Sequence, residues 1–292
     1  MDLFQYDFMI RALLGALIIG LAAPALGIYL VQRRLSLIGD GIGHVALTGV
    51  GVGLLLNQSP VLSAVVVAAV GAVGVELIRE RGRTSGDLAL ALLFYGGIAG
   101  GVVLVSLSND ASSNSLMQYL FGSLITTSPQ DVTVIAVLGA AVLIAMLAFR
   151  PALFAVCNDE EYARVSGLPV RALNLLMAVT TAVTVTIAMR TVGLLLVSAL
   201  MVIPVAAAQQ VTRGFRSTMA AAMAIGLVAA GAGVVVSAEA DTPPGATTVI
   251  LALAAFVAIT VGAAGLRLVR RRAQPPREVE PPDVVLQEAG VR

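Results

Sequence analysis

The chain has 292 residues, of which 58% are hydrophobic and 12% charged, with a mean hydropathy of +0.96 and a formal net charge of +1. Soluble domains average about 45–50% apolar and about 25% charged residues, so this composition excludes an ordinary soluble domain. Runs of roughly 20 apolar residues recur along the chain, as membrane-spanning helices require. No basic surface with interleaved aromatic residues points to a nucleic-acid partner. The sequence therefore predicts an all-α membrane protein with many spans.

Nine spans are predicted from hydropathy and helix-breaking residues. In chain order they cover residues 8–31, 36–56, 61–78, 86–107, 131–149, 171–189, 191–208, 217–236 and 246–267. The first run lacks a positively charged lead-in and is too long for a cleaved signal peptide, so it is predicted to be a retained span. Two stretches leave eight or ten spans open. Residues 115–128 are polar enough to lie at the interface or re-enter the membrane, and residues 191–208 contain Pro204, which can break a helix.

The arginines predict the orientation of the chain. With nine spans and the N-terminus outside, 16 of the 18 arginines fall on one side and only Arg11 and Arg190 on the other. Because basic residues are enriched in cytoplasmic loops, we expect the N-terminus outside and the C-terminus in the cytoplasm, in the cell (inner or plasma) membrane.

The end of the sequence has a different composition from the spans. Residues 273–292 are dominated by proline and charge and offer no apolar face to bury, so they are predicted to form a disordered cytoplasmic tail. A group of arginines directly before this tail is interpreted as a stop-transfer anchor: Arg267, Arg270, Arg271 and Arg272.

Two features of composition limit the chemistry. Cys157 is the sole cysteine, which excludes an internal disulfide and a cysteine-rich metal site. All 18 basic residues are arginines, and a P-loop needs its lysine to reach the phosphates of ATP. An ATPase that drives this protein must therefore be a separate chain. No catalytic residue is expected, because the serines lack a base partner. No permanently bound cofactor is expected either.

An acid and the sole histidine of the chain lie within the second predicted span. Asp40 and His44 are four residues apart, so on a helix their side chains share one face. A charged side chain at mid-bilayer costs about 2.5–3.5 kcal/mol on insertion scales, so such a pair suggests a function. Carboxylate oxygen and imidazole nitrogen suit first-row divalent metals. One helix supplies two ligands, and a two-fold dimer would supply the four that zinc prefers.

The same pair has a simpler interpretation. Asp40 lies about one turn inside the predicted cytoplasmic boundary, so it can be a solvated residue of the helix start that is hydrogen-bonded to His44. The glycines around the pair are more often used for close helix packing than for ligand chemistry. From spacing alone, both interpretations stay open.

Several stretches resemble the membrane permeases of bacterial ABC importers for zinc, manganese and iron. The stretch "RRLSLIGDGIGHVALTGVGVG" (33–53) resembles the signature of that family, an arginine pair followed by Ser-x-x-Gly-Asp-x-x-x-His. The stretch "LMQYLFGSL" (116–124) is similar to a segment of the zinc branch. Three more stretches fit in the same order: "EEYARVSGLPVRALNLLMAV" (160–179), "RTVGLLLVSALMVIPVAAAQ" (190–209) and "DTPPGATTVIL" (241–251). The similarity runs from about residue 10 to 268, and Glu239 departs from the family pattern.

This resemblance implies a type II ABC-importer-like permease domain over residues 1–272. It would work as a homodimer with cytoplasmic ATPase subunits and an extracytoplasmic metal-binding protein, and would pass the ion by alternating access. Asp40 and His44 occupy the positions of the family's metal-contacting pair. Asp241, in an outer loop, is most simply a turn residue at the start of the last span, with entry of metal as a second interpretation.

The segment at 160–179 resembles the part of the family that meets the ATPase. Asp159 and the acids after it suit a helix start, and Gly167 suits a helix end, so a short helix is predicted here. The residues expected to couple to the ATPase are Glu160, Glu161, Tyr162, Ala163, Gly167 and Leu168. An ordinary solvated connector is the alternative.

Zinc is the favoured cargo, on the "QYLFG" resemblance alone, with manganese or iron as the alternatives. A proton-coupled secondary transporter that uses Asp40 and His44 as a relay is a different class of function. The predicted docking segment and the lack of charges in several spans argue against it. A structural scaffold would leave the intramembrane pair unexplained.

Overall fold

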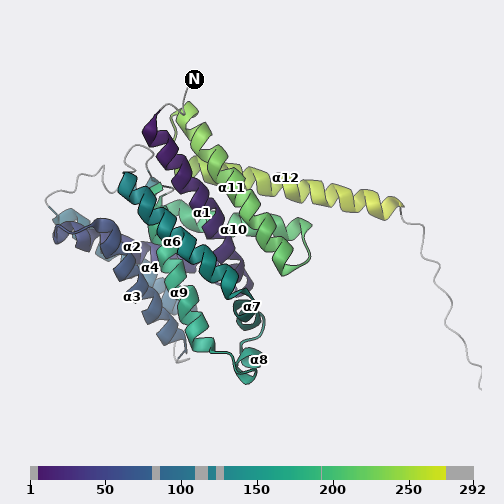
Figure 1. Cartoon of the computed structure of the whole chain (residues 1–292), viewed down its shortest axis with the longest axis horizontal. Helices are drawn as coiled ribbons and strands as arrows, with labels where there is room; N and C mark the ends of the chain where they lie inside the picture. Colours follow the sequence, from purple (N-terminus) through teal and green to yellow (C-terminus); the bar gives the residue numbers. More distant parts are fainter. Residues whose placement is uncertain (1–5, 81–85, 109–117, 123–127, 192, 274–292) are drawn as a thin grey trace, which may run out of the picture.

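The computed structural model describes residues 6–80, 86–108, 118–122, 128–191 and 193–273, and every regular element among them is a helix (Figure 1). The helices are α1 (Asp7–Gln32), α2 (Ile38–Leu55), α3 (Pro60–Glu80), α4 (Gly86–Leu107), α6 (Pro129–Ala148), α7 (Arg150–Asn158), α8 (Glu160–Val165), α9 (Val170–Thr191), α10 (Leu194–Val211), α11 (Phe215–Ala240) and α12 (Pro244–Ala273). Eight of them are long and apolar enough to cross a membrane: α1, α2, α3, α4, α6, α9, α11 and α12. This confirms the prediction of a polytopic helical bundle.

The seventh predicted span, 191–208, coincides with α10, of which the apolar part among the described residues, Val197–Val211, is shorter than the other eight. Of the alternatives left open for this stretch, a helix broken at Pro204 is not found, because Pro204 lies inside a continuous α10. The chain turns earlier, at Gly193, whose φ of 92° lies in the left-handed region that glycine adopts without steric penalty.

Two further expectations concern residues that the structure describes only in part. Within 115–128, residues 118–121 are helical and Gly122 follows with a φ of 78°. The rest of that stretch, apart from Ser128, lies outside the described residues, so its interfacial or re-entrant character stays a prediction. The same holds for the tail, since the described chain ends with α12 at Ala273.

Residues 150–158 form a helix, α7, that the sequence analysis did not predict. Proline suits its first turn, where the missing N–H has no helical acceptor, and Pro151 stands there. Leu153 and Val156 are three residues apart and both are buried, which places them on one inward face. A nine-residue amphipathic helix is too short to register as a span, and this explains why hydropathy missed it.

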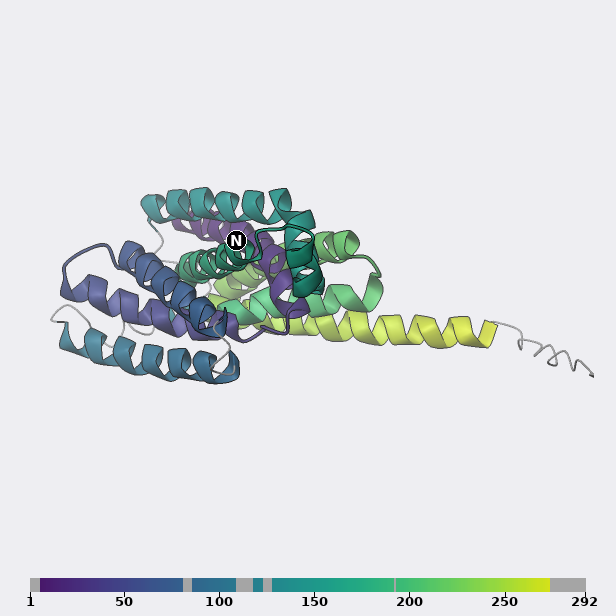
Figure 2. The same cartoon turned by 90° about the horizontal axis from the view of Figure 1, so that it is seen from below.

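The bundle has a buried centre and an exposed periphery. The apolar windows of α1 and α9 are each 72% buried and that of α2 is 67% buried, whereas those of α4 and α12 are 17% and 11% buried. In Figures 1 and 2, α2, α3 and α4 form one side, and α12 extends away on the other. Small residues let the central helices approach closely: a Cβ added to Gly20 of α1 would lie 2.8 Å from the carbonyl oxygen of Gly226 of α11.

Candidate functional site

Helix α2 carries the predicted pair Asp40 and His44. It begins at Ile38, so Asp40 lies in its first turn, where a carboxylate interacts favourably with the positive end of the helix dipole. His44 follows one turn later on the same face. The α2 helix packs against α3, α4, α9 and α10, which places this turn inside the bundle rather than on its rim.

The imidazole of His44 is buried, with 6% of the residue exposed. Its ring meets the ring of Phe94 of α4 edge to face, with centroids 4.4 Å apart and planes at 78°. Its Nδ1 atom is buried and has no hydrogen-bond partner in the part of the chain that the structure describes. A buried polar atom left without a partner costs about 1–3 kcal/mol, so this nitrogen is a candidate ligand atom.

Asp40 is half-buried and opens onto a pocket between α2 and α4. The pocket has a volume of about 270 Å³ and is lined by Leu37, Asp40, Leu90, Ala91, Phe94 and Tyr95. Its walls are apolar apart from the carboxylate and the phenol of Tyr95, a residue that is 71% exposed. Asp40 is the sole charged residue among those that line this pocket, so a cation that enters the pocket would be attracted to its carboxylate.

A close helix contact holds the His44 turn in place. Thr48 of α2 donates a hydrogen bond from its hydroxyl to the carbonyl oxygen of Gly97 of α4, at 2.8 Å. A Cβ added to Gly97 would lie 2.6 Å from both the carbonyl carbon of His44 and the amide nitrogen of Val45. Glycine at 97 is therefore what allows α4 to lie directly on the backbone of His44.

One chain supplies an incomplete set of metal ligands. Among the described residues, no group of three or more histidine, cysteine, aspartate or glutamate side chains is close enough to hold a metal ion. Asp40 and His44 thus remain a pair. Asp241 lies elsewhere: it is exposed and caps the end of α11 in the left-handed conformation, with a φ of 51°. Asp241 is a turn residue ahead of the last span, as predicted, since α12 starts three residues later at Pro244, and its role in metal entry stays a prediction.

The predicted coupling segment forms the short helix α8. Asp159 caps its start by accepting a hydrogen bond from the backbone N–H of Tyr162, at 2.9 Å. At its end, the N–H groups of Gly167 and Leu168 donate to the carbonyl oxygens of Arg164 and Ala163. This is the Schellman arrangement, and it needs the positive φ of 82° that Gly167 has. The sequence prediction of a helix with these two ends is confirmed.

The side chains of α8 divide between the bundle and the outside. Ala163 is fully buried, and Glu160 and Leu168 are half-buried. Glu161 is exposed, as are Tyr162 at 68% and Val165 at 89%. Tyr162 and Val165 are three residues apart and therefore neighbours on one face. Together they form a small face of α8 that the described bundle leaves uncovered.

Arg33 connects α8 to the bundle, a role that the sequence analysis missed. It directly follows α1, and only 8% of its side chain is exposed. One guanidinium nitrogen donates to Glu160 of α8 and the other to Asn174 of α9, each at 2.7 Å. Burial and then the neighbouring Arg79 lower the pKa of Arg33, while Glu160 raises it. Two nitrogens of one planar guanidinium group make these contacts, which the single ammonium group of a lysine could not reproduce.

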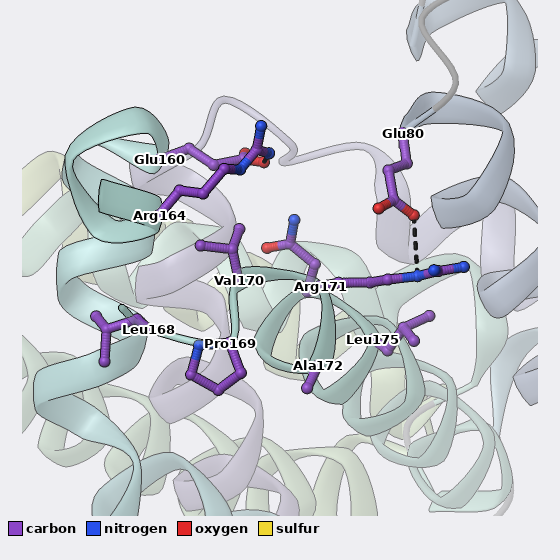
Figure 3. A pocket seen from close by; sticks show the side chains of 10 residues that line it. Glu80, Glu160, Arg164, Leu168, Pro169, Val170, Arg171, Ala172 and Leu175 are labelled. Carbon is purple, nitrogen blue, oxygen red and sulfur yellow. Dashed lines mark hydrogen bonds and ion pairs between the residues drawn. The ribbon is translucent and has the colours of Figure 1, made fainter. Parts of the chain in front are cut away.

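A second cross-helix ion pair lies beside α8. Figure 3 shows a pocket of about 630 Å³, bounded by α8, the start of α9 and the end of α3. Glu80 of α3 accepts from Arg171 of α9 at 3.2 Å, and Arg164 of α8 lies 3.4 Å from Glu160. Glu76 pairs with Arg79 at 2.8 Å, and Glu76 is buried.

The sequence analysis also missed Phe94 and Tyr95, although the sequence contains a local signal for these two residues. Phe94 and Tyr95 are the sole aromatic residues of the fourth predicted span, and they directly precede a glycine pair. That local signal marks a place where a helix approaches a neighbour closely, but the sequence does not say which helix. The partners of Arg33 lie 127 and 141 residues away, so no local pattern could have identified them.

Comparison with known proteins gives this geometry a context. The membrane protein ZnuB of a high-affinity zinc uptake system from Haemophilus influenzae is 28% identical over 253 residues, covering 87% of this chain and 97% of that protein. The manganese transport system membrane protein MntC of Halalkalibacterium halodurans is also 28% identical, over 255 residues and 87% of each chain.

A solved structure, PsaBC from Streptococcus pneumoniae in complex with Fab, aligns with a TM-score of 0.81 at 27% identity, covering 92% of this chain and 97% of that chain. The model of the ABC 3 transport family matches residues 5–263. The chain therefore belongs to the ABC 3 transport family.

Proposed function

We propose that this chain is the membrane permease of an ATP-driven importer of divalent metal ions, with zinc as the cargo. The observation that carries the proposal is the His44 Nδ1, which is buried, without a partner, and one helical turn from the half-buried Asp40. Burying polar groups in an apolar bundle costs free energy, and binding a passing cation is a function that would account for their presence. Relatives named for zinc and for manganese transport support a metal cargo.

The proposed pathway lies between two copies of the chain. A single copy offers one carboxylate and one imidazole, and a two-fold axis beside α2 and α4 would bring two of each together. Four nitrogen and oxygen ligands suit a tetrahedral zinc ion. Tyr95 is exposed at the edge of the Asp40 pocket, on the side that a second copy would cover.

The preference for zinc rests on a smaller feature. The two transport relatives, named for zinc and for manganese, are equally identical to this chain, so their similarity does not favour either metal. The Gln118–Gly122 segment resembles the zinc branch of the family and supports zinc, with manganese or iron as the alternative cargo.

The energy for transport would come from cytoplasmic ATPase subunits that dock on α8, and the ion from an extracytoplasmic metal-binding protein. The exposed Tyr162 and Val165 form a contact surface of the right kind, because they are apolar and lie outside the long helices. The arginines that surround α8, including Arg33 and Arg171, support a cytoplasmic position for this end of the bundle by the positive-inside rule. Arg33 would then pass movement of α8 to α1 and α9.

The test is metal uptake in a strain that lacks this chain and carries a plasmid copy of it. Asp40→Asn and His44→Gln keep the size of each side chain but remove a ligand, so ATP-dependent uptake of zinc should fall at least tenfold. Asp131→Asn is the matched control, because Asp131 belongs to the capping box of α6 and lies outside the proposed pathway. Normal uptake by both pathway variants would overturn the site. Rescue by manganese and never by zinc would overturn the cargo and leave the permease assignment standing.

A further inference from the structure

A second pocket at the same end of the bundle as α8 carries positive charge without a carboxylate. It has a volume of about 570 Å³ and lies where α7 and α11 begin. Its lining residues are Arg150, Pro151, Phe154, Gly214, Phe215, Arg216 and Ser217. We call it the arginine pocket. Its floor is aromatic, with the rings of Phe154 and Phe215 4.8 Å apart.

The charge of the arginine pocket is not neutralised by the described part of the chain. Four other arginines at this end (Arg33, Arg79, Arg164 and Arg171) each pair with a glutamate. Arg150 and Arg216 form no such pair with any carboxylate that the structure describes. Two guanidinium groups without a described carboxylate partner, in one pocket with two phenylalanine rings, suit a segment that carries both carboxylates and apolar side chains.

A segment of that composition follows α12 in this chain. Residues 278–288 read "EVEPPDVVLQE", with four carboxylates, no basic residue and the apolar run Val284, Val285 and Leu286. The spacing places acids on both sides of the apolar run. The segment therefore matches the pocket in charge and in apolar character.

The segment is also within reach. Arg267 of α12 donates a hydrogen bond to the carbonyl oxygen of Gln210 at 2.9 Å, which ties α12 to the end of α10. Figure 2 shows α12 passing beside the α10–α11 turn before it extends away. Gln210 is four residues from Gly214 of the pocket, and Ala273 is six residues of helix beyond Arg267, so the pocket lies within roughly 30 Å of Ala273. Ten extended residues, from Ala273 to Asp283, cover about 34 Å.

We propose that residues 278–288 dock in the arginine pocket, with their carboxylates on Arg150 and Arg216 and their apolar run against Phe154 and Phe215. The docked segment lies against α7, which is separated from α8 by Asp159 alone. The tail thereby contacts the element next to the coupling helix. This inference rests on charge, composition and reach, and it stands whether or not zinc is the cargo.

The test is a cross-link between the tail and the pocket. In a Cys157→Ser background, Val285→Cys and Ser217→Cys are introduced, and the purified chain in phosphatidylcholine nanodiscs is treated with a short bifunctional maleimide. We expect a cross-link within one chain, so that the cross-linked protein still migrates as a monomer in denaturing gels. Replacing Arg150 and Arg216 together by glutamine should reduce the cross-link about three- to tenfold, as for the loss of two exposed ion pairs.

Arg213→Gln is the matched control, because Arg213 is an exposed arginine of the same turn that does not line the pocket. It should leave the yield unchanged. An undiminished cross-link in the Arg150→Gln, Arg216→Gln chain would overturn the proposal. So would a cross-link solely between two chains, or one that phosphatidylglycerol nanodiscs abolish, since the pocket would then hold a second copy's tail or an anionic lipid headgroup.

Discussion

Replacing Gly97 by alanine tests whether the contact between α4 and the His44 turn matters. The added methyl would lie 2.6 Å from the backbone of His44 and Val45, against at least 3.4 Å for an ordinary contact. The α4 helix must therefore retreat by about 0.8 Å or more, which also strains the hydrogen bond from Thr48 to the Gly97 carbonyl. Overpacking of this size costs about 1–3 kcal/mol.

Gly96 provides the control for this change. It is the next residue of the same helix, and a Cβ there would meet nothing within 4 Å. Both substitutions gain the same helix propensity of about 1 kcal/mol, so the difference between them isolates the clash.

The two variants are compared in two assays. The first is the temperature at which half of the detergent-solubilised protein is lost from its size-exclusion peak. The second is metal uptake by cells at matched expression. Gly97→Ala should melt several degrees below Gly96→Ala and should transport more slowly, because His44 moves with its backbone. Equal melting and equal uptake would refute the argument that this crossing positions the imidazole.

Three further predictions follow from the cytoplasmic end. Gly167→Val should lower metal uptake per ATP hydrolysed, since the positive φ of 82° costs a β-branched residue about 1–2 kcal/mol. Gly167→Asn should retain the normal ratio of uptake to hydrolysis, because asparagine tolerates this conformation. Equal ratios in the two variants would contradict this prediction. Arg33→Met should lower the free energy of unfolding by about 1–3 kcal/mol, because it leaves the buried amide oxygen of Asn174 without its donor and removes one of the two arginine partners of Glu160. The exposed Glu161→Gln should change nothing, and matching thermal midpoints in detergent would count against the contact. Burial raises the pKa of Cys157 to about 11, so its maleimide labelling should be slow at pH 7 and rise about tenfold per pH unit to pH 9; a rate that levels off near pH 8.5 would show an ordinary thiol.

The sequence was most informative where a feature depends on neighbouring residues. Hydropathy located the long helices because each must cover its own length with apolar side chains. A spacing of four put Asp40 and His44 on one face, and Asp159 and Gly167 gave the two ends of α8, because helix caps depend on a few adjacent backbone groups. The family resemblance rested on several motifs in one order along the chain, which is more specific than any single motif.

What the sequence could not provide depends on contacts between distant segments. The Phe94 ring on His44 and the Arg33 bridge to Glu160 join helices far apart in the chain, and only the packing of the bundle decides which helices meet. The α7 helix was missed for a different reason: it is amphipathic and short, so it resembles a connector in hydropathy. The effect of Pro204 could not be decided from the sequence, because a helix packed by its neighbours can tolerate an interior proline.

The burial of Arg33 separates two cytoplasmic contacts by their response to ionic strength. Raising salt from 0.1 to 1 M shortens the Debye length from about 10 to about 3 Å, which weakens attraction between groups in water and leaves enclosed groups nearly unaffected. Arg33 is enclosed, whereas Arg216 is exposed to solvent. Raising the salt concentration of one sample should thus release residues 278–288 from the arginine pocket while α8 stays bound to α1 and α9. The two contacts can therefore be distinguished without a substitution.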